Sequence, residues 1–204
     1  MLEHIAAFIT HVISSLGYPG VAALMAIESA CIPLPSEIIL PFSGYLVATG
    51  RFALWGVALA GAVGSVVGSL VAYALGAWGG RPLVDRYGKY VLISGRDMDR
   101  ADRWFARRGD VTVLIGRVVP VVRTFIGFPA GMSRMGLWRY NVYTFVGSFV
   151  WSLALAWIGR ALGRHWNVLG GYFHRFDVVI VALVVLAVLL HVIRHLGSRN
   201  ERED

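Results

Sequence analysis

The sequence predicts an all-α polytopic membrane protein. We expect two inverted repeats, each a re-entrant helical hairpin plus a transmembrane helix, and a further C-terminal transmembrane helix. Of the 204 residues, 57% are hydrophobic, and the mean hydropathy is +0.65, as is typical of a chain embedded in lipid. Residues 51–81 also align without a gap with residues 134–164, and twelve of these 31 pairs are identical. Residues 1–204 are therefore predicted to form a single domain with an internal repeat.

Three stretches are long and apolar enough to be transmembrane helices. Residues 52–80 contain no charged side chain and exceed the roughly 20 residues that a helix needs to cross about 30 Å of hydrocarbon. Residues 141–159 also qualify, as do residues of about 176–194 near the C-terminus. The glycines of the first stretch lie at helical spacing, which lets helix backbones approach closely.

A proline-bearing apolar segment precedes each of the first two spans. Each segment divides into two arms that are too short to cross a bilayer as separate helices. Arms of this kind predict helical hairpins that enter the membrane and return to the same face, although one kinked span in each place is the alternative. The arms are residues 19–32 and 36–50 around Pro33 and Pro35, and residues 110–119 and 121–133 around Pro120.

Two re-entrant hairpins would make the two repeats inverted. Repeat one would cover about 18–81 and repeat two about 110–164, and their hairpins would enter from opposite faces and meet near the midplane. Secondary transporters commonly build a substrate site in this way. A duplicated helix without a transport role is the alternative.

The charges outside the spans predict the orientation. Residues 81–110, the two arginines Arg134 and Arg139 and the C-terminal tail together carry thirteen Lys and Arg, against four at the opposite face. The positive-inside rule places the linker of about 82–109 and the C-terminus in the cytoplasm. Met98, Ala101, Trp104 and Phe105 share one helical face of the linker, which predicts a helix at the membrane surface; a solvated linker helix is the alternative. The net charge of +7 is then explained by anionic lipid headgroups rather than by nucleic acid.

Four ionisable residues lie within the two proline-bearing segments: Glu28 and Glu37 in the first, Arg117 and Arg123 in the second. A charge at membrane depth costs at least ~2.5 kcal/mol, so such residues usually line a cavity, pair with one another or bind a polar substrate. Guanidinium groups bind phosphate oxygens in a bidentate manner. We expect the arginines to bind substrate and the glutamates to act as counter-charges or proton carriers. A static ion-pair cluster that locks the hairpins together is the alternative.

The remaining chemistry is sparse. Cys31 is the only cysteine, so it has no partner for an internal disulfide or a Cys-ligated metal site. The chain has neither a HExxH zinc motif nor a GxSxG nucleophile motif. We therefore expect no enzyme activity, no metal and no cofactor. Tyr73, in the first span, could donate a hydrogen bond into the site or simply pack.

Several motifs occur in order and resemble the DedA family, which is related to the VTT-domain lipid scramblases. The resemblance covers roughly residues 18–165 and implies two facing hairpins and movement of lipid across the bilayer. It places the family's essential acids on Glu28 and Glu37 and its essential arginines on Arg117 and Arg123. The motifs are Glu28-Ser-Ala-Cys-Ile-Pro33-Leu-Pro35-Ser36-Glu37, Gly64-x3-Gly68-x4-Tyr73-x2-Gly76-x3-Gly80, Gly116-Arg117-Val-Val-Pro120-Val-Val-Arg123-Thr124 and Pro129-Ala-Gly131.

The predicted function is a lipid transporter or flippase in the bacterial cytoplasmic membrane. The resemblance favours undecaprenyl phosphate, the envelope carrier lipid, with proton coupling compatible with the two acids. A phosphatidylethanolamine flippase or scramblase, and a membrane scaffold that transports nothing, are the alternatives. A homo-oligomer is compatible with the sequence. The expected site comprises Arg117 and Arg123 for substrate, Glu28 and Glu37, the turn residues Pro33, Pro35 and Pro120, and Tyr73 and Thr124 at its edge.

Overall fold

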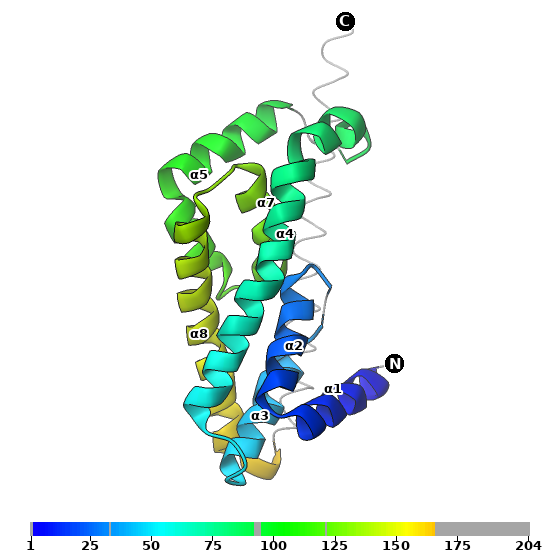
Figure 1. Cartoon of the computed structure of the whole chain (residues 1–204), viewed down its shortest axis with the longest axis vertical. Coiled ribbons are helices and arrows are strands. Elements are labelled where there is room, and N and C mark those ends of the chain that lie inside the picture. Colours follow the sequence, from blue (N-terminus) through cyan, green and yellow to red (C-terminus); the bar gives the residue numbers. More distant parts are fainter. Residues whose placement is uncertain (1, 33, 92–94, 121, 166–204) are drawn as a thin grey trace, which may run out of the picture.

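The computed structural model is all-helical and describes residues 2–32, 34–91, 95–120 and 122–165 (Figure 1). The predicted C-terminal span of about 176–194 lies outside these residues, as does Pro33. The helices are α1 (Leu2–Leu16), α2 (Tyr18–Ser29), α3 (Ser36–Ala48), α4 (Leu54–Val91), α5 (Gly95–Gly116), α6 (Val122–Phe125), α7 (Gly127–Met132) and α8 (Leu137–Leu162), followed by a 3-10 turn, Gly163–His165.

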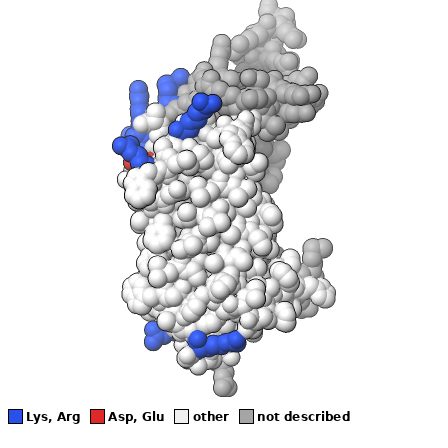
Figure 2. All heavy atoms as spheres, in the orientation of Figure 1, with Lys and Arg blue, Asp and Glu red and all other residues white. Residues whose placement is uncertain are grey.

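Helices α4 and α8 are the two long elements, and they pack against each other along the long axis of the molecule (Figure 1). Within α4, Leu54–Gly80 is apolar enough to cross a membrane by length and composition, and so is α8. Both predicted spans are thus helices. In a space-filling view, Lys and Arg side chains lie at the two ends of the molecule, and the face between them carries none (Figure 2). This distribution suits a chain whose middle lies in hydrocarbon.

The first proline-bearing segment forms two antiparallel helices, α2 and α3, at one end of the molecule (Figure 1). Pro19 occupies the first turn of α2, where a missing N–H is tolerated. Pro35 directly precedes α3 in an extended conformation (φ −76°, ψ 96°), which sets the direction of the second helix. The predicted arms end within three residues of these helices.

The second proline-bearing segment is less regular and lies at the other end of the molecule (Figure 1). Its first arm is the last part of α5, which bends at Arg108 (φ −136°). Its second arm, predicted as one helix, is divided into α6 and α7. Pro129 has no N–H to donate to the carbonyl of Phe125, so a continuous helix loses a bond where α6 ends.

Three helix crossings bring backbones into direct contact. At the first, Gly64 and Gly68 of α4 face the carbonyl oxygens of Ala22 and Ala26 in α2, and the other two join α3 with α8 and α7 with α4. At each crossing, a methyl group added to either of two glycines would overlap a carbonyl oxygen of the facing helix. At the other two, the glycines and the residues that they face are Gly44 with Ala156 and Gly159 with Pro41 where α3 crosses α8, and Gly131 with Tyr73 and Gly76 with Phe128 where α7 crosses α4. Gly76 and Gly159 occupy the same position in the aligned segments 51–81 and 134–164, as do Tyr73 and Ala156. These two crossings, α3 with α8 and α7 with α4, therefore use corresponding residues.

The buried apolar side chains form two clusters, one at each end. The larger cluster joins α1, α2, α3, α4 and α8, and the smaller one joins α4, α5, α7 and α8. The polar site described next lies between them.

Candidate functional site

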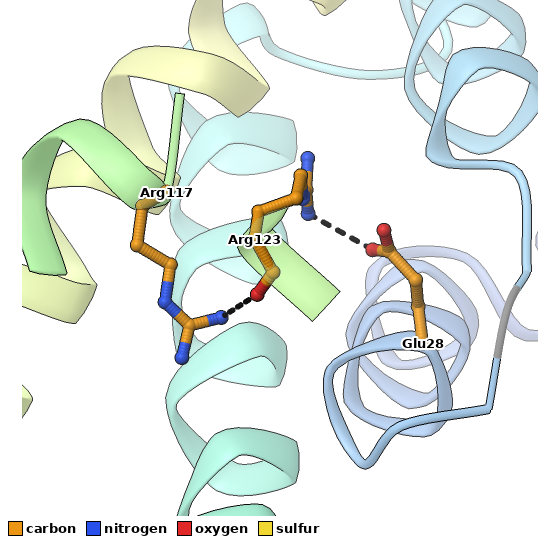
Figure 3. Close-up of polar contacts among 3 residues, drawn as sticks. All are labelled: Glu28, Arg117 and Arg123. Atoms are coloured by element: carbon orange, nitrogen blue, oxygen red, sulfur yellow. Dashed lines mark hydrogen bonds and ion pairs between the residues drawn. The ribbon is translucent and has the colours of Figure 1, made fainter. Parts of the chain in front are cut away.

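The two proline-bearing turns meet through a buried ion pair (Figure 3). Glu28 lies in the last turn of α2 and Arg123 lies in α6. The Arg123 Nη2 donates to Glu28 Oε2 at 2.9 Å, and the two side chains are 2% and 4% exposed. Removing a carboxylate and a guanidinium from water is costly unless they pair with good geometry. This contact joins segments that are 95 residues apart in the sequence.

Arg117 connects the second turn to both long helices. Its Nη1 donates to the carbonyl oxygen of Arg123 at 2.9 Å (Figure 3), and its Nη2 donates to the Tyr140 hydroxyl at 3.0 Å. The hydroxyl of Tyr140, in α8, donates a hydrogen bond to the carbonyl oxygen of Ser69 in α4 at 3.2 Å. The partners of Arg117 are thus neutral oxygens, and its side chain, 1% exposed, has no carboxylate bound to it among the described residues.

Both guanidinium groups retain N–H donors that find no partner among the described residues. These are Nη1 of Arg123 and Nε of Arg117, each fully buried. The ring of Trp151, 5.3 Å from the Arg123 Cζ, supplies a cation–π contact but no acceptor. Unpaired donors on buried charged groups are rare, and a missing water, ion or ligand is the usual explanation. The two guanidinium groups can therefore donate hydrogen bonds to further oxygen atoms.

Glu37 lies in the first turn of α3 and is also buried. It is close enough to Glu28 for the two carboxylates to repel each other. Thr124, in α6, is 7% exposed, and its carbonyl oxygen accepts a weak hydrogen bond from the Cys31 Sγ at 3.7 Å. The structure thus brings both predicted acids and both predicted arginines to the place where the two turns meet.

Tyr73 does not bond to any of the four charged residues. Its hydroxyl donates to the carbonyl oxygen of Met135, and its ring lies 5.0 Å from that of Tyr140. Tyr73 therefore supports the residue that holds Arg117. Pro35 and Pro120 lie in the turns as predicted, next to α3 and between α5 and α6.

The sequence did not single out Tyr140, Trp151 or a set of buried hydroxyls between the long helices. Four of these hydroxyls have no hydrogen-bond partner: Ser65, Thr144, Ser148 and Ser152. Ser65 aligns with Ser148 and Ser69 aligns with Ser152, so the shared serines of the two segments were the available signal. Among the described residues, no three potential metal ligands come together.

Comparison with known proteins identifies relatives over most of the chain. The VTT domain model matches residues 34–161. "Undecaprenyl phosphate transporter A" of Bacillus subtilis is 36% identical over 179 residues, 86% of this chain and 87% of that protein. The uncharacterized membrane protein YkoX of the same organism is 33% identical, over 93% of this chain and 85% of that protein. An "alkaline phosphatase-like protein" of Lactococcus lactis is 32% identical, over 95% and 94%. No solved structure matches the chain.

The match to the VTT domain covers more than half of the residues, and it includes Glu37, Arg117 and Arg123. The relatives match at nearly full length and are named as transporters, membrane proteins or, in Lactococcus, phosphatase-like proteins. The resemblance inferred from the sequence motifs is thus confirmed. The chain is a membrane protein of the VTT-domain (DedA) family.

Proposed function

We propose that the protein moves a phosphorylated lipid across the bacterial cytoplasmic membrane, with undecaprenyl phosphate as the favoured substrate. The observation that carries this proposal is the pair of buried guanidinium groups, Arg117 and Arg123, that have unpaired N–H donors where the two turns meet. Phosphate oxygens are the acceptors that such planar forks bind best. The relative named undecaprenyl phosphate transporter A supports the choice of lipid.

The Glu28–Arg123 pair suggests how a phosphate could be bound and released. A buried guanidinium that loses its carboxylate is destabilised by about 3–5 kcal/mol unless another anion replaces it. A phosphomonoester carries up to two negative charges, so it can replace the Glu28 carboxylate and satisfy both arginines. Glu28, displaced from its partner, would then take up a proton, which gives a route to proton coupling. In this scheme the covalent structure of the lipid does not change, so the protein acts as a transporter and not as an enzyme.

The arrangement of the helices supports alternating access through two inverted repeats. The α2–α3 pair and the α5–α7 segment lie at opposite ends and meet at their turns, as re-entrant hairpins would. The matched glycine crossings, α3 on α8 and α7 on α4, support a repeated unit. Transporters built in this way expose a central site to one face and then to the other. We assign the arginine-rich end, with α5, to the cytoplasm.

Transport by purified protein in proteoliposomes tests the proposal. The readout is transbilayer movement of undecaprenyl phosphate and, separately, of phosphatidylethanolamine. Arg117→Lys and Arg123→Lys keep the charge but lose the planar fork, so each should lower the transport rate by at least tenfold. Arg160→Lys, an exposed arginine at the far end of α8, is the matched control and should leave the rate unchanged.

The alternatives give different results. Rapid movement of phosphatidylethanolamine with none of undecaprenyl phosphate would identify a phospholipid flippase or scramblase. Movement of neither lipid by folded protein would favour a membrane scaffold. Full activity of both lysine variants would remove the arginine pair from the substrate site.

A further inference from the structure

A second cationic site lies at the arginine-rich end, outside the buried cluster. There, the bend of α5 and the segment between α7 and α8 enclose a cavity of about 490 Å³. This volume is well above the roughly 30 Å³ of one water molecule and within the range of small-molecule sites. Among the described residues that line it, Asp110 is the only acid, against four arginines. The arginines are Arg107, Arg108, Arg134 and Arg139.

In the described part of the chain, no carboxylate forms an ion pair with these arginines. Arg108 lies over the Trp104 ring at 5.4 Å. Like charges on one cavity repel one another, and an anion in the cavity would relieve that repulsion. Lys and Arg side chains gather at this end in the space-filling view (Figure 2).

Arg134 also adopts a backbone conformation that an arginine rarely takes. Its φ is +49°, in the left-handed region that favours glycine. It follows α7 in a C-terminal cap: its N–H donates to the Gly131 carbonyl at 2.9 Å, and the N–H of Met135 donates to the Ala130 carbonyl at 3.1 Å. Glycine is the usual residue at this position of such a cap. An arginine that is strained here points to a use for its side chain.

A short series of contacts joins this cavity to the buried arginines. Met135 lines the cavity, and its carbonyl oxygen accepts the hydrogen bond from Tyr73. The ring of Tyr73 packs at a tilt of 38° against that of Tyr140, which in turn accepts the hydrogen bond from Arg117. Two tyrosine rings thus separate the cavity from the predicted substrate site.

We propose that this cavity is a second phosphate-binding site, which receives the phosphomonoester headgroup of a lipid at the membrane surface on its way to or from Arg117 and Arg123. As a step of transport it rests on the proposed function. Its own chemistry, a cluster of uncompensated guanidinium groups, would bind a phosphate group in any case. The headgroup is favoured over free phosphate because part of the cavity lining, Arg139 and Tyr143, belongs to α8, a helix apolar enough to cross a membrane.

The test uses the purified full chain in detergent and measures equilibrium binding of a short-chain prenyl monophosphate and, separately, of inorganic phosphate. Arg134→Gly is the informative variant, because glycine suits the backbone at this position while the guanidinium is lost. It should unfold at the same temperature as the wild type or higher. It should bind the prenyl monophosphate about tenfold more weakly, with the difference shrinking at high salt. Arg160→Gln, at the opposite end of α8, is the control and should bind normally.

Measurements in an Arg117→Lys/Arg123→Lys background separate this proposal from the proposed function. Binding at the cavity should persist there, even if the protein moves no lipid. In transport, Arg134→Gly should raise the lipid concentration for half-maximal rate.

Unaltered binding by Arg134→Gly and by Arg139→Gln would overturn the second site, whatever the transport assay shows. Wild-type binding of inorganic phosphate as tight as that of the prenyl monophosphate would overturn the assignment to a lipid headgroup.

Discussion

Gly76→Ala should destabilise the protein, because Gly76 lies where α4 and α7 touch through their backbones. An added Cβ would lie 3.0 Å from Met132 N and from the carbonyl carbon of Phe128, and closer still to the Phe128 oxygen. Carbon atoms pack best at about 3.5–4.0 Å, so one helix must move away from the other. Overpacking of this kind costs about 1–3 kcal/mol. Gly79, three residues along the same helix, has nothing within 4 Å of an added Cβ. Gly79→Ala is therefore the matched control and should gain up to about 1 kcal/mol from helix propensity.

Thermal unfolding of the detergent-purified variants measures the difference, which should be about 1–3 kcal/mol between the two alanines because both gain the same helix propensity. Transport should also fall in Gly76→Ala, since α7 leads directly from the turn that carries Arg123. Equal stability of Gly76→Ala and Gly79→Ala would refute the close crossing, and with it the structural support for a repeated unit.

Two further predictions concern the ion pair and the topology. Glu28→Gln alone should cost about 3–5 kcal/mol of unfolding free energy because it leaves Arg123 buried without its carboxylate. Adding Arg123→Gln should recover part of that loss. If the effects of the two substitutions add within about 0.5 kcal/mol, the pair is not coupled. In a cysteine-free background, cysteines at Ser15 and Thr49 should both react with an impermeant thiol reagent from outside the cell, and one at Arg107 only from the cytoplasm. Labelling of Ser15 and Thr49 from opposite sides would rule out the re-entrant hairpin.

The sequence predicted the helices well and some of their ends poorly. The apolar stretch of residues 52–80 does form a helix, yet α4 continues to Val91. Hydropathy reports where the apolar layer ends, whereas a helix ends only where the backbone loses its hydrogen bonds or meets a cap. The predicted arm of residues 121–133 is divided into α6 and α7 for a related reason. Its apolar residues alone favour one helix, but Pro129 interrupts the hydrogen bonds of that helix.

The charged members of the site could be found from the sequence because a charge in an apolar segment is conspicuous. Tyr140 and Trp151 could not, since aromatic residues are common in transmembrane spans and nothing in their spacing separates a packing role from a contact with arginine. The buried serines posed the same difficulty. Only the three-dimensional structure shows that Tyr140 contacts Arg117 and that Trp151 contacts Arg123.

The contacts also divide the molecule into parts that should stay together and a part that should change during transport. The α2–α4, α3–α8 and α4–α7 crossings join backbones without intervening side chains, so we expect the two helices of each crossing to stay together. The link between the two turns instead includes the single ion pair from Glu28 to Arg123 and the weak bond from Cys31 to Thr124. A phosphate that displaces Glu28 would break the stronger of these two contacts. Substrate binding and separation of the turns would then be one event, and its energetic cost is what the double-variant cycle on the ion pair measures.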